Sequence, residues 1–222
     1  MITYVRGLCY RKYYSRYGVR GLCGEVDTNF SMADTDMSEV PTDKNRMIHS
    51  LSVARQVPSL LQGLFATELI APSSCLWLVS PWVSNIPILD NTANAFRHVE
   101  PNWPRGKVRL AAVLTKLIEE GTTIHVATRP ERRGAWVEST NAFLQVLSES
   151  VGYEAERLVV HREREEHLHQ KGLLGDHFYL RGSMNFTHNG IQVNNEQVEF
   201  TRSEDAIARA RHEFKERWGG SA

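Results

Sequence analysis

A histidine and a lysine two residues apart, His169 and Lys171, are the best candidates in this chain for chemistry on a phosphate ester. Residues 168–174 are predicted to form a strand, and residues two apart on a strand project from the same face. An imidazole beside a fixed cation suits attack on a phosphodiester. The cation offsets charge on the non-bridging oxygens, and the imidazole accepts the phosphoryl group or delivers a proton. Alone, this pair is a weak signal, because many strands contain it by chance.

Further polar and small residues follow the pair at a spacing that strengthens the signal. The chain runs HQKGLLGD over 169–176, GSMNFT over 182–187 and NNE over 194–196. Together these segments resemble the signature of the phospholipase D superfamily: H-x-K-x-x-x-x-D, then G-S-x-N, then a glutamate. The resemblance covers roughly residues 50–218 and is specific over 169–196. It is closest to the small bacterial nucleases of that superfamily that carry a single motif.

The resemblance implies a role for each matching residue. His169 would be the nucleophile that forms a phosphohistidine in one subunit and the acid that protonates the leaving oxygen in the other. Lys171 and Asn185 would hold the phosphate oxygens, with Ser183 supporting them from the same turn. Glu196 would accept a hydrogen bond from the imidazole and fix its tautomer, an orienting role that a histidine base needs.

Two more matching positions, Asp176 and Gly182, would support the site without touching substrate. The superfamily site needs two H-x-K motifs, whereas this chain contains one. The resemblance therefore implies a homodimer whose two chains meet across a two-fold axis and share one site. It also implies hydrolysis without a metal or other cofactor. A bacterial defence or DNA-modification system is the biological setting that the size and type of the chain suggest.

Strand-like and helix-like segments alternate from about residue 47, which predicts an α/β sandwich with a mixed sheet flanked by helices on both faces. Residues 85–105 contain three prolines and are predicted to be loop or broken helix. The predicted strands are 75–79, 122–127, 158–162, 168–174, 177–181 and 197–202, and the predicted helices are 48–69, 107–120, 135–150 and 203–218.

Residues 1–46 differ from this body, which we place at 47–222. They begin basic and rich in tyrosine, turn acidic, and show no sustained periodicity, so we predict a poorly ordered arm. One alternative is an arm that lies on a nucleic acid, where cations meet phosphates and rings stack on bases. Another is an upstream stretch included by a wrong start codon, with Met32, Met37 or Met47 as the true start.

Three arginines, Arg129, Arg132 and Arg133, follow the second predicted strand, where loops of an α/β sheet tend to form the rim of a site. They are candidates for binding a polyanionic substrate, and a solvated loop is the alternative. Two further residues have competing interpretations. His167 shares the predicted strand face with His169 and is either a residue that lines the pocket or an ordinary surface histidine. Glu199 is the alternative to Glu196 as the glutamate of the signature, but the period of two places it on the opposite face, so Glu196 is preferred.

A zinc site is the alternative use for the histidines of the second half of the chain. Their spacing fits no H-E-x-x-H or finger pattern, and no carboxylate lies suitably between them, so the sequence favours no metal. These histidines are His161, His167, His169, His177 and His188.

Composition and charge narrow the setting. The formal net charge is zero, so a nucleic-acid site must come from local clustering. The three cysteines include no C-x-x-C pair, which favours a reducing, cytoplasmic location. No apolar run approaches the ~20 residues that span a bilayer, so no stable membrane association is expected. The resemblance to single-motif nucleases implies DNA or RNA as the substrate, with a phospholipid substrate or an inactive scaffold subunit as the alternatives.

Overall fold

The computed structural model describes residues 45–49, 56–129, 135–163, 168–194 and 196–219. These residues belong to a compact unit that spans 42–222. The strands are β1 (Asn45–His49), β2 (Cys75–Val79), β3 (Pro87–Asp90), β4 (Lys107–Arg109), β5 (Thr123–Thr128), β6 (Leu158–Arg162), β7 (Gly172–Leu174), β8 (Tyr179–Gly182) and β9 (Gln197–Thr201). The helices are α1 (Gln56–Ile70), α2 (Leu110–Glu119), α3 (Ala135–Val151), the 3-10 helix η1 (Gly152–Arg157), α4 (His188–Gln192) and α5 (Glu204–Trp218).

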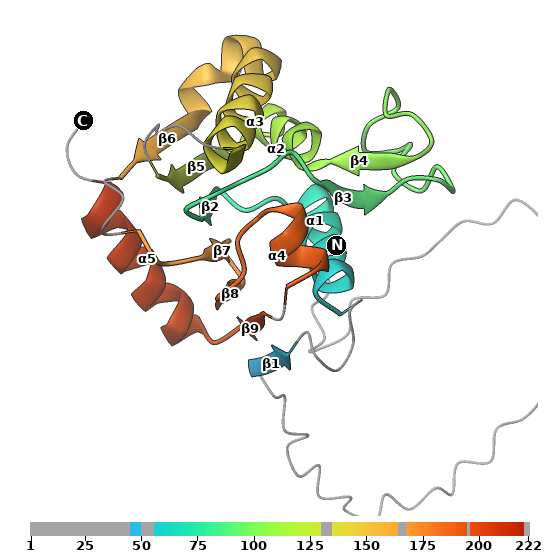
Figure 1. The fold of residues 1–222 in the computed structure, drawn as a ribbon. Helices are drawn as coiled ribbons and strands as arrows, with labels where there is room; N and C mark the ends of the chain where they lie inside the picture. The colour runs from blue at the N-terminus through green and yellow to red at the C-terminus, as the bar shows by residue number, and fades with distance from the viewer. Residues whose placement is uncertain (1–44, 50–55, 130–134, 164–167, 195, 220–222) are drawn as a thin grey trace, which may run out of the picture. The chain divides into compact units, whose positions relative to one another are not determined.

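Seven strands form one mixed sheet in the order β1-β9-β8-β7-β2-β5-β6 (Figure 1). β2, β5 and β6 run parallel to one another, and β7, β8, β9 and β1 continue the sheet in antiparallel pairs. β3 and β4 form a separate two-stranded sheet. β7, which directly follows Lys171, is thus the middle strand of the sheet.

Alternating residues of each strand supply two hydrophobic cores, one on each face of the sheet. Leu76 and Leu78 of β2 face the core that α1, α2, α3 and α4 cover. Trp77 and Val79 face the core formed with Phe214 of α5. Helices therefore flank both faces, and the predicted fold class is confirmed (Figure 1).

Several local predictions need correction. β1, which pairs with β9 from Asn45 onward, was not predicted. Residues 56–70 form the first helix, which begins later than the predicted 48–69. The segment 85–105 contains the short strand β3, and α4 was not predicted. Residues 1–44, which belong to the predicted poorly ordered arm, lie outside the described residues.

The strand predicted over 168–174 also needs correction, because β7 includes only Gly172–Leu174. A strand needs a hydrogen-bonded neighbour, and β2 offers one only as far as Val79, which pairs with Gly172. Beyond Val79 the neighbouring chain turns at Pro81, which lacks the N–H that would continue a ladder. His169 and Lys171 therefore lie in the loop that enters β7.

Candidate active site

The sheet register brings distant segments together at one edge. Val79, the last residue of β2, pairs with Ala127 of β5 and with Gly172, the first residue of β7. Gly172 pairs in turn with Arg181 near the end of β8, and Gly182 pairs with Val198 near the start of β9. The loops around 80–82, 129, 168–171, 183–187 and 194–196 therefore meet at this edge, which we call the site edge.

His169 and Lys171 occupy the centre of the site edge. The His169 side chain is exposed, and the Lys171 ammonium donates to the His169 backbone carbonyl at 2.6 Å. Burial lowers the pKa of Lys171, the charge of Arg129 lowers it further, and the carboxylate of Glu196 opposes the shift. Lys171 is therefore a partly desolvated cation close to both groups, and two of its three N–H bonds remain for a ligand.

Gly182 begins the turn that carries Ser183 and Asn185, and the turn needs a glycine at this position. A Cβ on Gly182 would lie 2.0 Å from the backbone oxygen of Gln197, well inside van der Waals contact. This close approach lets the Ser183 N–H donate to the same Gln197 oxygen at 3.0 Å. The turn after β8 is thus held against the start of β9.

Asn185 is positioned by Ser80, which follows β2. The Ser80 hydroxyl lies 3.3 Å from Asn185 Oδ1 and accepts from the Phe186 N–H at 3.2 Å. The same hydroxyl lies 2.7 Å from the Trp82 carbonyl, so its one proton serves either acceptor. With Oδ1 directed at Ser80, the Asn185 amide nitrogen has no hydrogen bond with a described residue and remains available as a donor. The sequence predicted the strand that ends before Ser80, but it gave the Ser80 hydroxyl no role.

Glu196 is buried and lies against the same turn. The Ser183 hydroxyl donates to one of its carboxylate oxygens, and the Asn194 side-chain amide donates to the other at 3.2 Å. The Ser183 hydroxyl also accepts from the Gln197 N–H at 3.1 Å. The carboxylate therefore fixes Ser183 and counters the charge of Lys171. A hydrogen bond from His169 to Glu196 stays a prediction.

Arg129 packs closely at the site edge. One guanidinium nitrogen donates to the Leu168 carbonyl at 3.3 Å, and the guanidinium lies 5.0 Å from the centre of the Trp82 ring. Its Nε is buried without a hydrogen-bond partner among the described residues. Arg129 is thus a fixed cation beside Lys171. Arg132, Arg133 and His167 lie outside the described residues, and their predicted roles stay predictions.

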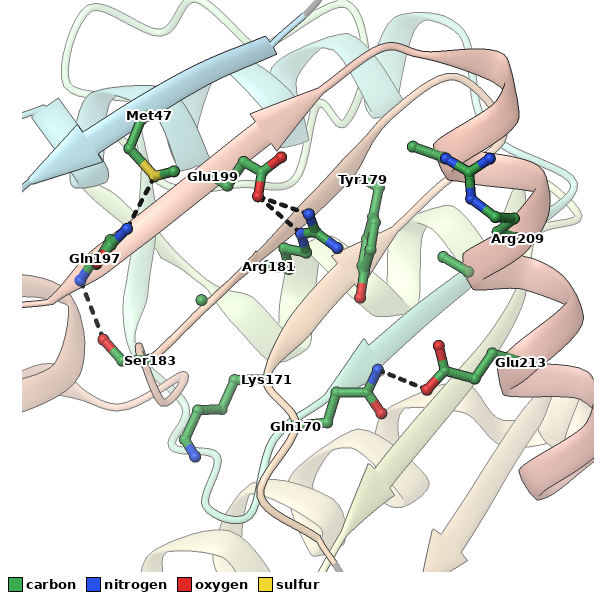
Figure 2. Close-up of a pocket in the computed structure, with 13 residues that line it drawn as sticks. Met47, Gln170, Lys171, Tyr179, Arg181, Ser183, Gln197, Glu199, Arg209 and Glu213 are labelled. Atoms are coloured by element: carbon green, nitrogen blue, oxygen red, sulfur yellow. Dashed lines mark hydrogen bonds and ion pairs between the residues drawn. The ribbon is translucent and has the colours of Figure 1, made fainter.

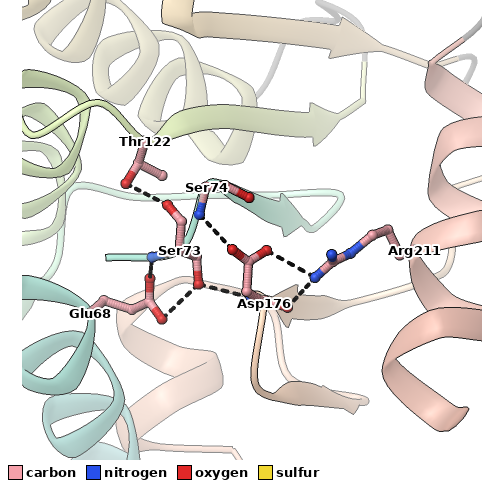
Figure 3. A network of polar contacts seen from close by, with 7 residues as sticks. Glu68, Ser73, Ser74, Thr122, Asp176 and Arg211 are labelled. Atoms are coloured by element: carbon pink, nitrogen blue, oxygen red, sulfur yellow. Dashed lines mark hydrogen bonds and ion pairs between the residues drawn. The ribbon is translucent and has the colours of Figure 1, made fainter. Parts of the chain in front are cut away.

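Asp176, the last residue of the H-x-K-x-x-x-x-D segment, lies at the opposite end of β7 (Figure 3). One carboxylate oxygen accepts from the Ser74 N–H at 2.6 Å, and the other accepts from Arg211 of α5 at 2.9 Å. The Asp176 N–H donates to the Ser73 hydroxyl at 2.8 Å, and this hydroxyl donates to buried Glu68. Asp176 therefore joins the β7–β8 turn, the start of β2 and α5.

A groove of about 610 Å³ adjoins the site edge on the α5 face of the sheet (Figure 2). Lys171 and Ser183 line the groove where it meets the site edge. Arg181 and Glu199 form an ion pair on its floor at 2.8 Å, so Glu199, the sequence rival of Glu196, lies on the groove side. Sequence periodicity gave no signal for this groove, because its wall comes from α5, far along the chain.

Within the described part of the chain, no three His, Cys, Asp or Glu side chains converge in a way that could hold a metal ion. Among the described helices, none has both the length and the apolar character needed to cross a bilayer.

Comparison with known proteins identifies the fold. NucT from Helicobacter pylori matches with a TM-score of 0.50 and 13% identity, over 78% of this chain and 94% of that chain. Nuc, a phospholipase D family member from Salmonella typhimurium, matches with a TM-score of 0.52 and 13% identity, over 79% and 93%. The polyphosphate kinase of Porphyromonas gingivalis matches with a TM-score of 0.54 and 14% identity, over 81% of this chain but 26% of that one. At these identities the likeness concerns the fold.

Sequence comparison gives the family. No curated protein sequence matches the chain at a significant level. A family model described as the phospholipase D-like domain of cardiolipin synthase matches residues 89–218, more than half of the chain. This span contains the H-x-K segment, the G-S-x-N turn and Glu196. The chain therefore belongs to the family of phospholipase D-like domains.

Proposed function

We propose that this protein is a metal-independent nuclease that hydrolyses phosphodiester bonds of DNA or RNA through a phosphohistidine at His169, in a site shared by two subunits. The observation that carries the proposal is the convergence at one sheet edge of an exposed imidazole, a partly desolvated ammonium and a free amide donor. These belong to His169, Lys171 and Asn185. The pairing of a nucleophile with fixed donors for phosphate oxygens is what phosphoryl transfer requires.

The first step would form the covalent intermediate. The lone pair of one His169 imidazole forms an N–P bond, and the bond between phosphorus and the leaving oxygen breaks. The leaving oxygen takes a proton from the second His169 imidazole, contributed by the partner subunit. Lys171 and the Asn185 amide would donate to the non-bridging oxygens, where charge builds up. Arg129 would add a second positive charge beside them.

The second step would regenerate the enzyme. The now neutral second imidazole takes a proton from water, whose oxygen forms a new bond to phosphorus while the N–P bond breaks. The sum of the two steps is hydrolysis of one phosphodiester, with both imidazoles returned to their starting state. Glu196 would hold the reacting imidazole in one tautomer, and Ser183 would keep the carboxylate in place.

A direct test uses purified protein with labelled single-stranded DNA, double-stranded DNA, RNA and a phospholipid, each assayed with and without excess EDTA. The proposal expects cleavage of a nucleic acid at the same rate in both conditions, since Lys171, Asn185 and the paired histidines supply the stabilisation that a metal would otherwise give. Activity that vanished with EDTA and returned with magnesium or zinc would contradict the proposed mechanism.

The phospholipid in this panel tests a second candidate. The family model that matches the chain is described by a cardiolipin synthase domain, which favours transfer of a phosphatidyl group as the alternative to hydrolysis of nucleic acid. The same imidazole and cations would serve either reaction, since both proceed at a phosphodiester. Turnover of the phospholipid with none of the three nucleic acids would replace the nuclease proposal by this one.

A further inference from the structure

The groove between α5 and the sheet carries a specific inference about substrate. We propose, as an extension of the nuclease function above, that this groove binds one single-stranded segment of nucleic acid next to the scissile phosphate. Arg209 of α5 would contact a phosphate of that segment. The groove begins at Lys171 and Ser183, so a chain whose phosphate lies at the site edge has a continuous path into it (Figure 2).

The size of the groove favours one strand over two. Its volume of about 610 Å³ falls within the range that holds a drug-sized ligand, comparable to a nucleotide and too small for a turn of duplex. Ala206 and Ala210 form the part of the α5 wall between the larger residues. Because alanine side chains are short, the space between helix and sheet stays open on this flank of α5.

The chemistry of the groove suits both parts of a nucleotide. Arg209 is exposed and has no hydrogen bond or ion pair with any described residue, so its guanidinium is available for a phosphate. Gln170, Gln197 and Glu199 supply amide and carboxylate groups at the floor, which donate to and accept from base edges. Arg181 is already paired with Glu199. The other charged side chains that line the groove are the cations Lys171 and Arg209 and the carboxylate of Glu213, so the positive charges exceed the negative charges by one.

The test compares Arg209→Ala and Arg209→Glu with a matched control, Arg202→Ala. Arg202 is also exposed, has no ion pair with a described residue, and lines a separate hollow on the other flank of α5. Binding is measured by titrating a fluorescent single-stranded oligodeoxynucleotide into each protein at several salt concentrations. Turnover is measured with the same oligonucleotide and with bis(p-nitrophenyl) phosphate, a small diester that reaches the site edge but not the groove.

For Arg209→Ala we expect Kd for the oligonucleotide to rise about tenfold and the slope of log K against log salt to fall by about 0.7, the value for one phosphate contact on a single strand. Arg209→Glu should weaken binding further. The ratio of kcat/KM on the oligonucleotide to that on the small diester should fall about tenfold. Arg202→Ala should leave Kd, slope and ratio near wild type.

The outcomes separate this inference from the function on which it rests. Cleavage of the oligonucleotide with unchanged Kd and ratio in both Arg209 variants would overturn the groove assignment and leave the nuclease proposal intact. Binding that depends on Arg209 without any cleavage would support the groove and contradict the nuclease. A duplex of the same sequence that bound as tightly as the single strand, or no binding of the oligonucleotide by wild type, would overturn the groove proposal.

Discussion

The two ends of β7 carry the two halves of one eight-residue motif, and their side chains are used in opposite ways. At the site edge, His169 is exposed and Lys171 donates one hydrogen bond to a backbone carbonyl, so both side chains keep groups available for a ligand. At the other end, Asp176 has committed both carboxylate oxygens and its N–H to neighbouring segments of the same chain. The comparison teaches that a signature can combine positions that are open to a ligand with a position that holds segments of the chain together.

The largest effect on activity should come from the end of β7 that carries His169. Replacing His169 with Ala is expected to lower kcat by at least ~10³-fold, on the scale of a lost nucleophile. Because His169 is exposed, its removal should leave the midpoint of thermal unfolding nearly unchanged. Steady-state kinetics and a melting curve on the same preparation check both statements. A variant with near wild-type kcat would remove the assignment of His169.

A second test asks whether the end of β7 that carries His169 needs a second subunit to form a working site, whereas the contacts of Asp176 are all made within one chain. Wild type mixed with a ninefold excess of His169→Ala protein should lose activity per wild-type subunit by about tenfold once subunits have exchanged, since most wild-type subunits are then paired with a subunit that lacks the imidazole. Exchange is verified with differently labelled subunits. Full activity after proven exchange, or a fully active monomer in sedimentation, would contradict the shared site.

Substitutions of Asp176, at the other end of β7, should lower the free energy of unfolding. Asp176→Ala leaves the Ser74 N–H without its acceptor and leaves the Arg211 guanidinium with the Gly175 carbonyl alone, at a cost of about 1–3 kcal/mol in the free energy of unfolding. Asp176→Asn keeps an acceptor oxygen and should lose less. Denaturant unfolding measures both variants. Loss of kcat in Asp176→Ala with unchanged stability would mean that this end takes part in the chemistry after all.

The smallest expected effect is a dependence of stability on pH. It comes from His125 and its neighbour His161, which are partly buried, unlike the exposed His169. His125 stacks on Trp77 with ring centres 3.9 Å apart, and its Nδ1 lies 3.0 Å from His161 Nε2. Burial, together with the charges of His161 and Lys215, lowers the pKa of His125 to about 4. The unfolded chain therefore binds more protons between pH 6.5 and about 4, and acid in this window should lower stability.

His125→Phe preserves a ring against Trp77 and removes this titration. The variant should show a shallower fall of the unfolding temperature between pH 6.5 and 4 than wild type, whatever its stability at neutral pH. Melting curves across this range provide the measurement. Equal slopes for the two proteins would mean that His125 is not the group that titrates.

Strands bounded by proline or by clear apolar runs were predictable from the sequence. Residues 75–79 and 158–162 were predicted with their observed limits, and the C-terminal helix was placed within one residue. β1 was missed because an edge strand paired on one side needs little periodicity, and Asn45–His49 lacks an alternating pattern. The end of a strand depends on its neighbour, which explains the overlong prediction at 168–174.

Residue types in the candidate site could be predicted, but their contacts could not. The motif pointed to Asn185 and Glu196, whereas the Ser80 hydroxyl that positions Asn185 lies 105 residues away in sequence. The role of Asp176 as a tie to Arg211 likewise depends on how α5 packs. Local periodicity contains no information on such long-range contacts, which follow from the strand order.

The strand order also determines when the site can form during synthesis. β2 is made well before its neighbour β7 and the turn before β9, so the site edge cannot be assembled until these later segments have been made. At a translation rate of about 5–20 residues per second, roughly 6–25 s separate the appearance of β2 from that of β9. Throughout that interval the nascent chain has no assembled site edge, so connectivity alone delays formation of the site until the domain is nearly complete.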